Sequence, residues 1–505
     1  MAIVNHGARL TRVFSLAITA AVLASCNRDR VLTVTDPDVI NPSNLASAEA
    51  AEALRVGAIS RLTDVTAGLI PQGGSLGEGV FQFGGALADE WRSTDTFVQR
   101  DQTDQRAIDA TNSAMTLIAR SLNRTRVAAI QAIPVLKQYK PLSISDVGQM
   151  FWIRGWAEMS IAETFCNGSP ISFLDASNAI QYGDPEPNTK IYERALASFD
   201  TATQNAPAGD ARADTVKWLS AISKARVMLD LGQFAQAGTT VTAANIPDSF
   251  KFFTSYSQPT TDNQIWALNN SAGRWMPADN EGPLGLNIRT ANDPRVPVCV
   301  GGQGTATTAY PNSCKAFDPN QTRATGFDNL TGSGNFLVQL VWPTRESDVA
   351  IVMATEAHLI RAEAALRSGD PVEFLARLNF LRANSDLFKQ PATLCRATVQ
   401  VQGCPTVPVG GTLLPPLTDP GTQAGREDLL FRERGFWLWS TGHRLPDLRR
   451  LVRPVADGGF GRAESAVYPT GPYYKGGVYG SNKSLVIPTA EENNPQFHGC
   501  LDLNP

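Results

Sequence analysis

Apolar side chains fall on one face of a helix in two separate segments of the chain. In the first segment, Trp218, Ile222, Ala225 and Leu229 stand at positions i, i+4, i+7 and i+11, the spacing typical of an amphipathic α-helix. The second segment has the same spacing at four positions: Met353, Ala357, Ile360 and Ala364. Each segment therefore predicts a helix with one buried face.

Both segments break at a glycine in the same pattern, Ala-x-x-x-Leu-x-x-Gly. Gly232 ends the first helix and Gly369 ends the second, because glycine supplies the left-handed backbone that a sharp helix end requires. Pro371 then stands at a favoured first-turn position of the next helix. Small alanines allow close antiparallel packing, so the pattern predicts helical hairpins of the tetratricopeptide type. The alternative is two unrelated amphipathic hairpins.

Other parts of the chain differ in their regularity. Helices are expected at about residues 47–62 and 145–166, the latter capped by Ser145 or Asp146. The glycine-rich stretch at residues 71–91, "PQGGSLGEGVFQFGGALADEW", is not expected to form a regular helix.

These elements indicate one mostly α-helical domain over residues 45–505, with few short strands. Its helical pairs are expected at about residues 145–245 and 350–385, with a late helix at residues 423–440. Two long irregular regions, at about residues 246–344 and 389–421, interrupt the helices. Such irregular insertions are where a ligand surface is expected.

The N-terminus has the pattern of an export signal. Arg9 and Arg12 precede an apolar run that is too short to span a bilayer, and the run ends in Leu-Ala-Ser before Cys26. This is the pattern of a bacterial lipobox, so residues 1–25 are expected to be a lipoprotein signal peptide and residues 26–44 a tether lipidated at Cys26. The alternative is an ordinary signal peptide that contains a cysteine. The residue after Cys26 is Asn27. By resemblance to the known sorting rule for lipoproteins, the absence of aspartate at this position favours the outer over the inner membrane.

Composition excludes some partners and adds a structural constraint. The net charge is −4, with no basic block, so nothing indicates nucleic-acid binding. Six cysteines remain after Cys26, and six allow 15 connectivities. Two pairs are close in sequence and the third is a long-range pairing: Cys299 with Cys314, Cys395 with Cys404, and Cys166 with Cys500. A metal site is the alternative, but the chain has no Cys-x-x-Cys and its four histidines lie far apart in sequence. No cofactor is expected.

Acid–base residue types cluster in "FRERGFWLWSTGHRLPDL", which ends in His443, Arg444 and Asp447. The stretch could be an active site or the buried end of a helix. Because Gly442 ends the late helix, His443 and Arg444 are expected to bond its last carbonyls, and Asp447 to pair with Arg444. We interpret the three residues as a structural latch.

A second enzyme-like feature is Asp89-Glu90 beside Trp91, which resembles the carboxylate pair of a glycosidase. Adjacent side chains usually point apart, so the two carboxylates are not expected to flank one bond. We therefore expect no catalytic residues.

A binding surface needs aromatic faces with polar groups at their edges. Candidates outside the repeat helices are Trp91, Arg92, Trp275, Asn287, Trp342 and Tyr473, the last in a glycine-rich loop with Tyr474 and Tyr479. The alternative for each is ordinary core packing.

Several stretches together resemble the SusD/RagB family of nutrient-uptake outer-membrane lipoproteins. Besides the Leu-Ala-Ser-Cys lipobox they are "GGALADEW", "AETFCNGSPIS", "ARVMLDLGQFAQA", "NDPR", "EAHLIRAEAALRSGD", "LNFLRA", "REDLLFRERGFWLWSTGHRLPDLRRL" and "VIPTAEENNP". Their order covers essentially the whole chain after Cys26. The family pattern near the end of the late helix resembles Glu-Gly-His-Arg-x-x-Asp-Leu. This chain differs from it at Thr441, where glutamate is common in the family, and matches the other positions.

The resemblance implies four tetratricopeptide-like pairs with a variable, loop-rich ligand region. It also implies a non-catalytic, surface-facing lipoprotein that captures an oligosaccharide or other nutrient and delivers it to a SusC-like TonB-dependent transporter. The alternatives are a tetratricopeptide scaffold of the envelope and a secreted glycan hydrolase.

Overall fold

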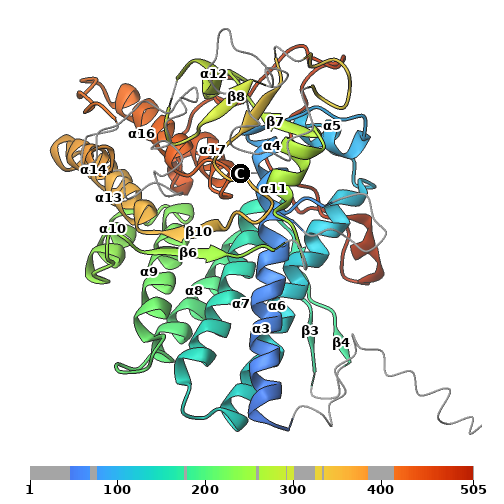
Figure 1. Cartoon of the computed structure of the whole chain (residues 1–505), viewed down its shortest axis with the longest axis vertical. Helices are drawn as coiled ribbons and strands as arrows, with labels where there is room; N and C mark the ends of the chain where they lie inside the picture. Colours follow the sequence, from blue (N-terminus) through green and yellow to red (C-terminus); the bar gives the residue numbers. More distant parts are fainter. Residues whose placement is uncertain are drawn as a thin grey trace, which may run out of the picture.

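The structure is a computed structural model of the whole chain (Figure 1). It describes residues 46–68, 77–175, 179–257, 261–291, 293–300, 325–332, 335–384 and 414–503. The expected signal peptide, Cys26 and the tether lie outside these residues. So do Cys314, Cys395 and Cys404, and both short-range cysteine pairings stay predictions.

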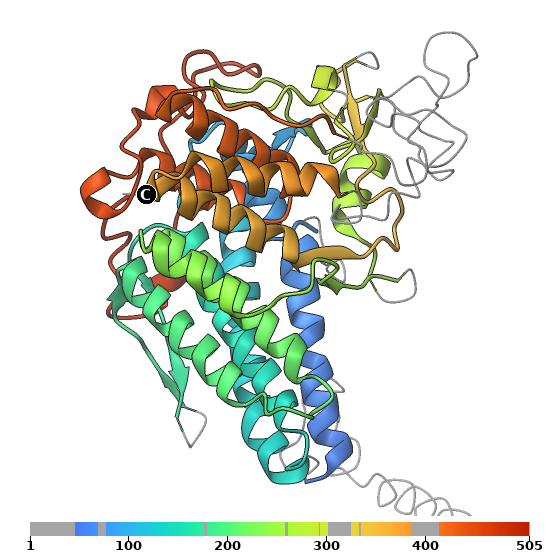
Figure 2. The ribbon, with the colours of Figure 1, turned by 90° about the vertical axis from the view of Figure 1, so that its left-hand side faces the viewer.

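Long helices lie side by side in the lower part of the molecule and continue into an upper group (Figures 1 and 2). The first group follows chain order: α3 (Ala48–Ala67), α6 (Ser113–Tyr139), α7 (Ile144–Thr164), α8 (Asn188–Gln204), α9 (Ala213–Asp230) and α10 (Phe234–Ala243). The upper group is α13 (Ala354–Ser368), α14 (Pro371–Ala383), α16 (Gln423–Trp437) and α17 (Arg444–Val452). α10 packs on α13 and joins the two groups.

The two expected hairpins are confirmed as α9–α10 and α13–α14. Gly232 and Gly369 have φ values of 73° and 76°, in the left-handed region that glycine adopts without strain. Pro371 opens α14, whose first turn is capped by the Asp370 carboxylate. Between the pairs, a Cβ added at Gly238 would lie 2.8 Å from that of Ala364, so small residues set the close approach of α10 and α13.

Three expectations about helices were wrong in detail. Residues Val80–Leu87 of the glycine-rich stretch form a buried helix, α4, because the missing side chain of Gly85 makes room for Trp91: an added Cβ would lie 2.8 Å from its ring. α7 begins at Ile144, so neither Ser145 nor Asp146 caps it. α16 ends at Trp437, and a turn follows it. The long helix α6, which contains a proline, has no counterpart among the expected elements.

Short two-stranded sheets and short helical segments lie at several places in the molecule, some at the top of Figure 1 and others between the two helix groups or beside the lower helices. In the described residues the antiparallel strand pairs are β1 (Trp91–Ser93) with β7 (Trp275–Pro277), β6 (Lys251–Thr254) with β10 (Val349–Met353), β8 (Val298–Val300) with β9 (Leu337–Gln339), β2 (Ser169–Pro170) with β5 (Pro185–Glu186), and β3 (Phe173–Leu174) with β4 (Ile180–Gln181). The short helical segments are α5 (Val98–Asp104), α11 (Gln264–Trp266), η2 (Ala267–Ser271), α12 (Ile288–Ala291), η5 (Val455–Asp457), η6 (Glu464–Ala466) and η7 (Thr489–Asn493). Mostly helical architecture with few short strands is therefore confirmed.

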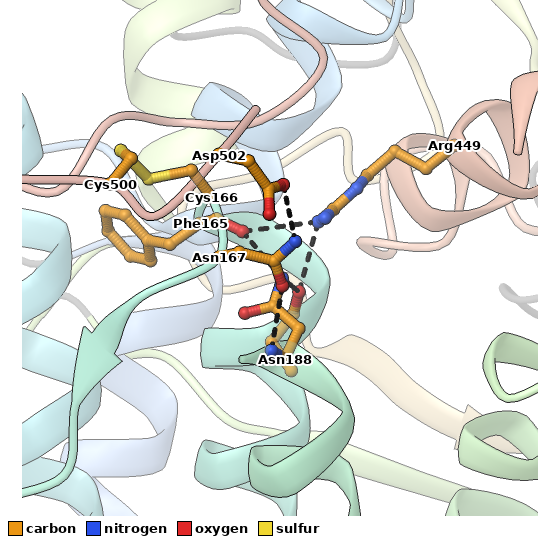
Figure 3. The surroundings of a disulfide bond; sticks show 8 residues. Phe165, Cys166, Asn167, Asn188, Arg449, Cys500 and Asp502 are labelled. Carbon is orange, nitrogen blue, oxygen red and sulfur yellow. Dashed lines mark hydrogen bonds between the residues drawn. A yellow bond between two sulfur atoms is a disulfide. The ribbon is translucent and has the colours of Figure 1, made fainter. Parts of the chain in front are cut away.

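A disulfide joins Cys166, at the end of α7, to Cys500 near the C-terminus (Figure 3). Hydrogen bonds lie beside the disulfide: the Asn167 side chain donates to Asp502 Oδ1 at 2.7 Å. The Asn188 amide and the Arg449 guanidinium both donate to the Phe165 carbonyl. The C-terminal segment is thereby attached to the helical body across 334 residues of sequence.

Within the described part of the chain, no helix combines the length and the apolar character that a membrane span requires. The same residues contain no group of three or more His, Cys, Asp or Glu side chains arranged to hold a metal ion.

Candidate ligand-binding site

The site begins with a tight loop, residues 471–480, in the C-terminal segment. Pro472 and Val478 form a bridge, and the Tyr473 amide donates to the Gly477 carbonyl at 3.1 Å. Gly476 and Gly477 have φ values of 102° and 76°, so glycine is needed to close this turn. The loop places three tyrosines together.

Tyr473 lies between the other two rings. Its centroid is 4.9 Å from that of Tyr474 and 5.3 Å from that of Tyr479, both edge to face, the arrangement that aromatic quadrupoles favour. Tyr473 is buried and its hydroxyl donates to Asp104 Oδ2 at 2.6 Å. Tyr474 and Tyr479 are half-buried and remain reachable from solvent.

β1 and the loop after β7 supply the polar edges of this tyrosine cluster. The Arg92 guanidinium lies 3.5 Å over the Tyr474 ring, and its Nε has no hydrogen-bond partner among the described residues. Glu281 accepts a hydrogen bond from the Tyr479 hydroxyl. Three segments far apart in sequence thus meet at one place.

Three buried or partly buried carboxyl groups at or near the cluster have raised pKa values: those of Asp89, Asp104 and Glu281. Burial, and then the proximity of Glu281, raises the pKa of both Asp89 and Asp104 well above the usual range. Burial also raises the pKa of Glu281. One oxygen of each carboxyl group has no hydrogen-bond partner in the described residues. Asp89 is held at φ 58°, a conformation that costs a non-glycine residue energy and is found at functional sites.

The cluster therefore offers the Arg92 guanidinium, the Glu281 carboxyl group and the rings of Tyr474 and Tyr479, all partly exposed. Such a set suits a ligand with many hydroxyl groups. Arg92 and Tyr473 had been identified from sequence, and Tyr474 and Tyr479 with them. Asp104 and Glu281 had not, because no local pattern links them to the tyrosine loop.

Three other predicted platform residues are core residues instead. Trp91, Trp275 and Trp342 are each 0% exposed. The indole N–H groups of Trp91 and Trp275 donate to Ser440 Oγ at 2.8 Å and to Glu78 Oε1 at 2.9 Å. The Trp342 ring stacks on Trp439, with centroids 6.1 Å apart. The prediction that these rings form a ligand platform was wrong, because β1, β7 and the segment that carries Trp342 turn these rings into the hydrophobic core.

Asn287 lies elsewhere, before α12. It is half-buried, accepts from Arg432 at 2.9 Å and donates to Thr290 at 3.1 Å. None of these contacts joins it to the tyrosine cluster.

Asp89 and Glu90 diverge, as adjacent side chains are expected to do. Glu90 Oε1 accepts from the Ser440 amide at 3.0 Å, whereas the charges nearest Asp89 are those of Glu281 and Arg106. The two carboxyl groups do not share one site.

The expected latch is buried, but its contacts differ from those predicted. His443 caps α17 and Arg444 begins it. Arg444 donates to the carbonyls of Phe431, within α16, and Leu284, rather than to the last carbonyls of the late helix. Asp447 does not pair with Arg444, because the Arg444 guanidinium is bonded to these carbonyls and the Asp447 carboxylate to Arg434 and Arg450.

Asp447 accepts two bonds of 2.7 Å from Arg434 and one of 2.7 Å from Arg450. Arg450 also pairs with Glu363 of α13 and Asp230 of α9. This buried ion network connects α9, α13, α16 and α17. Such networks hold their elements in register, and loss of one member leaves an uncompensated buried charge.

His443 extends the network at the same depth. Its Nε2 lies 3.0 Å from Glu356 Oε1 and 2.8 Å from an Arg226 nitrogen, and its Nδ1 lies 2.8 Å from the Thr441 hydroxyl. Burial lowers the pKa of His443, and the Arg226 charge lowers it further. Thr441, at the position where glutamate is common in the family pattern, is thus a partner of the histidine.

Comparisons with solved structures agree on one fold. A SusD-like protein from Bacteroides fragilis aligns with a TM-score of 0.57 at 13% identity, over 92% of this chain and 98% of that one. A SusD superfamily protein from Parabacteroides distasonis aligns with a TM-score of 0.58 at 13% identity, over 89% and 98%. A protein described as a laminarin-binding SusD-like protein aligns with a TM-score of 0.51 at 13% identity, over 90% and 99%.

No family model and no curated protein sequence matches the chain. The likeness is therefore one of three-dimensional structure, and it extends over nearly the whole of both chains in each comparison. The resemblance found in the sequence motifs is confirmed at this level: the chain has the SusD-like fold.

Proposed function

We propose that this protein is a lipid-anchored glycan-capture protein of the outer membrane that binds an oligosaccharide at the tyrosine cluster without converting it. The cluster is the observation that carries the proposal: Tyr474 and Tyr479 are partly exposed rings, and Arg92 and Glu281 supply polar groups beside them. Similarity to a protein described as laminarin-binding supports a glycan as the ligand class.

Delivery to a SusC-like TonB-dependent transporter and anchoring through the lipid on Cys26 complete the proposal. Both rest on the sequence pattern of the N-terminus and on the family resemblance. Replacing Cys26 with alanine should release the protein from the membrane fraction, and the intact protein should co-purify with a transporter. A membrane-bound Cys26→Ala variant would contradict the anchoring.

The binding site is tested by titrating a panel of neutral oligosaccharides, including laminarin fragments, into the protein without its first 26 residues. Tyr474→Ala should weaken binding by about fivefold, since a lost aromatic contact costs on the order of 1 kcal/mol. Tyr182→Ala is the matched control, because Tyr182 is an exposed tyrosine outside the cluster.

Binding that is equally strong in the Tyr474→Ala variant would exclude the cluster as the site. The alternative of a hydrolase has a separate readout: release of shorter sugars from the same panel, abolished by Asp104→Asn, would overturn the proposal of capture without conversion.

A further inference from the structure

A large groove lies apart from the tyrosine cluster and shares no lining residue with it. Its volume is about 1010 Å³. The helices α3 and α6 form its long walls, the β3–β4 hairpin forms another side, and residues 488–491 lie at one end. Figure 1 shows the hairpin running beside α6.

The lining of this groove is strongly basic. Arg61 of α3 and three arginines of α6 contribute to it, against the single carboxyl group of Glu491: Arg120, Arg124 and Arg126. Burial raises the pKa of Glu491, which weakens the only negative charge of the lining. Arg61 has one distant ion pair, 3.8 Å to Asp64, and in the described residues neither Arg120 nor Arg124 forms one. The groove is therefore positively charged, and carboxylates among the described residues compensate little of that charge.

Arg126 is the feature that ordinary folding does not explain. Its side chain belongs to a residue only 3% exposed, yet it forms no ion pair with a carboxylate of the described residues. One terminal nitrogen donates to the Ser172 carbonyl, and its Nε has no partner. Desolvation lowers the pKa of Arg126, and the nearby Glu158 carboxylate, which is bonded to Arg154 and Ser198, offsets this only in part. A buried cation normally has a paired anion, so an anion in the groove would supply the missing partner.

The hairpin adds apolar surface to the same groove. Phe173 and Ile180 are 56% and 57% exposed and line it together with Val127. Asn123 and Gln131 place amide groups between the arginines. The groove thus combines guanidinium groups, an exposed aromatic ring and amides, all on side chains.

We propose that this groove binds an acidic oligosaccharide, with its carboxylate or sulfate groups on the arginines and a sugar ring on Phe173. Guanidinium groups bind planar or tetrahedral oxyanions through paired hydrogen bonds, and amides serve the sugar hydroxyls. A volume near 1010 Å³ accommodates a ligand of a few sugar rings. This second site stands independently of the tyrosine cluster.

Two other anionic partners fit less well. A peptide needs partners for its backbone N–H and C=O groups, but the long walls are helices whose own backbone groups are already bonded. A planar membrane surface cannot reach into a concave groove, and Arg126 lies at its buried side.

The test uses the protein without its first 26 residues and four probes. These are an oligogalacturonate, its neutral methyl ester, a sulfated dextran oligosaccharide and unsulfated dextran. At least one acidic probe should bind about tenfold more tightly than its neutral counterpart, because one charge-assisted contact contributes more than 1 kcal/mol.

The double variant Arg120→Gln, Arg124→Gln should abolish that preference. Both side chains are exposed, so the variant should fold with an unchanged melting temperature. Lys190→Gln removes an exposed cation outside the groove and should leave binding unchanged. Arg126→Met, with its folding checked by melting temperature, should lower affinity for the same probe.

Three outcomes would overturn the proposal: equal affinity for acidic and neutral sugars, a preference that persists in the double variant, or equally tight binding of a glutamate peptide. Neutral-glycan binding at the tyrosine cluster is measured with Tyr474→Ala, so failure of one site is distinguished from failure of the other.

Discussion

Trp275→Ala separates a core role from a binding role at a ring that sequence patterns favoured as a ligand platform. The indole is fully buried, packs edge to face on Phe83 with centroids 5.9 Å apart, and donates to Glu78 Oε1. Truncating a buried tryptophan costs about 3–5 kcal/mol. Loss of the N–H donor to a buried carboxylate adds about 1 kcal/mol.

The assay is urea denaturation followed by far-ultraviolet circular dichroism, combined with glycan titration of the folded protein. Trp275→Ala should lower the denaturation midpoint strongly, whereas the affinity of the folded fraction should stay the same. Tyr474→Ala is the matched comparison: because its ring is half-buried, its midpoint should fall less than that of Trp275→Ala, and its binding should be weaker. A Trp275→Ala protein that keeps its midpoint and loses its ligand would refute the assignment of this ring to the core.

Three further predictions concern stability. Asp447→Ala should cost about 3–5 kcal/mol, because Arg434 and Arg450 lose a shared buried partner; a midpoint within error of the wild type would contradict the role of the ion network. Cys166→Ser should lower the free energy of unfolding by about 2–4 kcal/mol, because it removes the disulfide to Cys500. Wild-type protein treated with reductant should show the same lower denaturation midpoint. Loss of this disulfide should not lower the midpoint of the variant when reductant is added. Burial raises the pKa of Asp64 to about 6, above the unfolded value of about 3.9. A raised folded pKa means that stability is lost as pH rises between those values. Asp64→Asn should therefore stabilise the protein at pH 7.5 by up to about 2 kcal/mol and should change the free energy of unfolding little at pH 4. Equal effects at both pH values would show that the carboxyl group is not desolvated.

Local pattern was sufficient for the helical hairpins. The positions of Gly232, Gly369 and Pro371 predicted both turns, because left-handed backbone and a missing N–H are constraints of single residues. The same reasoning failed at α4, where two glycines inside a helix are tolerated only because of what packs on them. It also missed α6, whose Pro134 lies within a long helix.

The candidate sites depend far less on local pattern. Arg92 and the tyrosine loop stood out as residue types, yet the contact of Tyr473 with Asp104 joins positions 369 residues apart, and that of Tyr479 with Glu281 joins positions 198 residues apart. The basic groove was missed from the sequence, because the three arginines of α6 line a groove only where α3 brings Arg61 beside them and the β3–β4 hairpin closes the other side. Hydrophobic character alone placed Trp91, Trp275 and Trp342 equally well on a surface or in a core.

The sequence by itself determined the helices with clear periodicity and their glycine turns, since each depends on residues within one or two turns of each other. It also determined the family resemblance, which rests on the order of short motifs along the chain. Only the tertiary structure decided which aromatic rings are covered and which carboxyl groups lose water. It likewise decided that Asp447 faces Arg434 and Arg450 rather than Arg444. Burial and ion pairing depend on elements distant in the chain, and side-chain spacing within one element does not specify them.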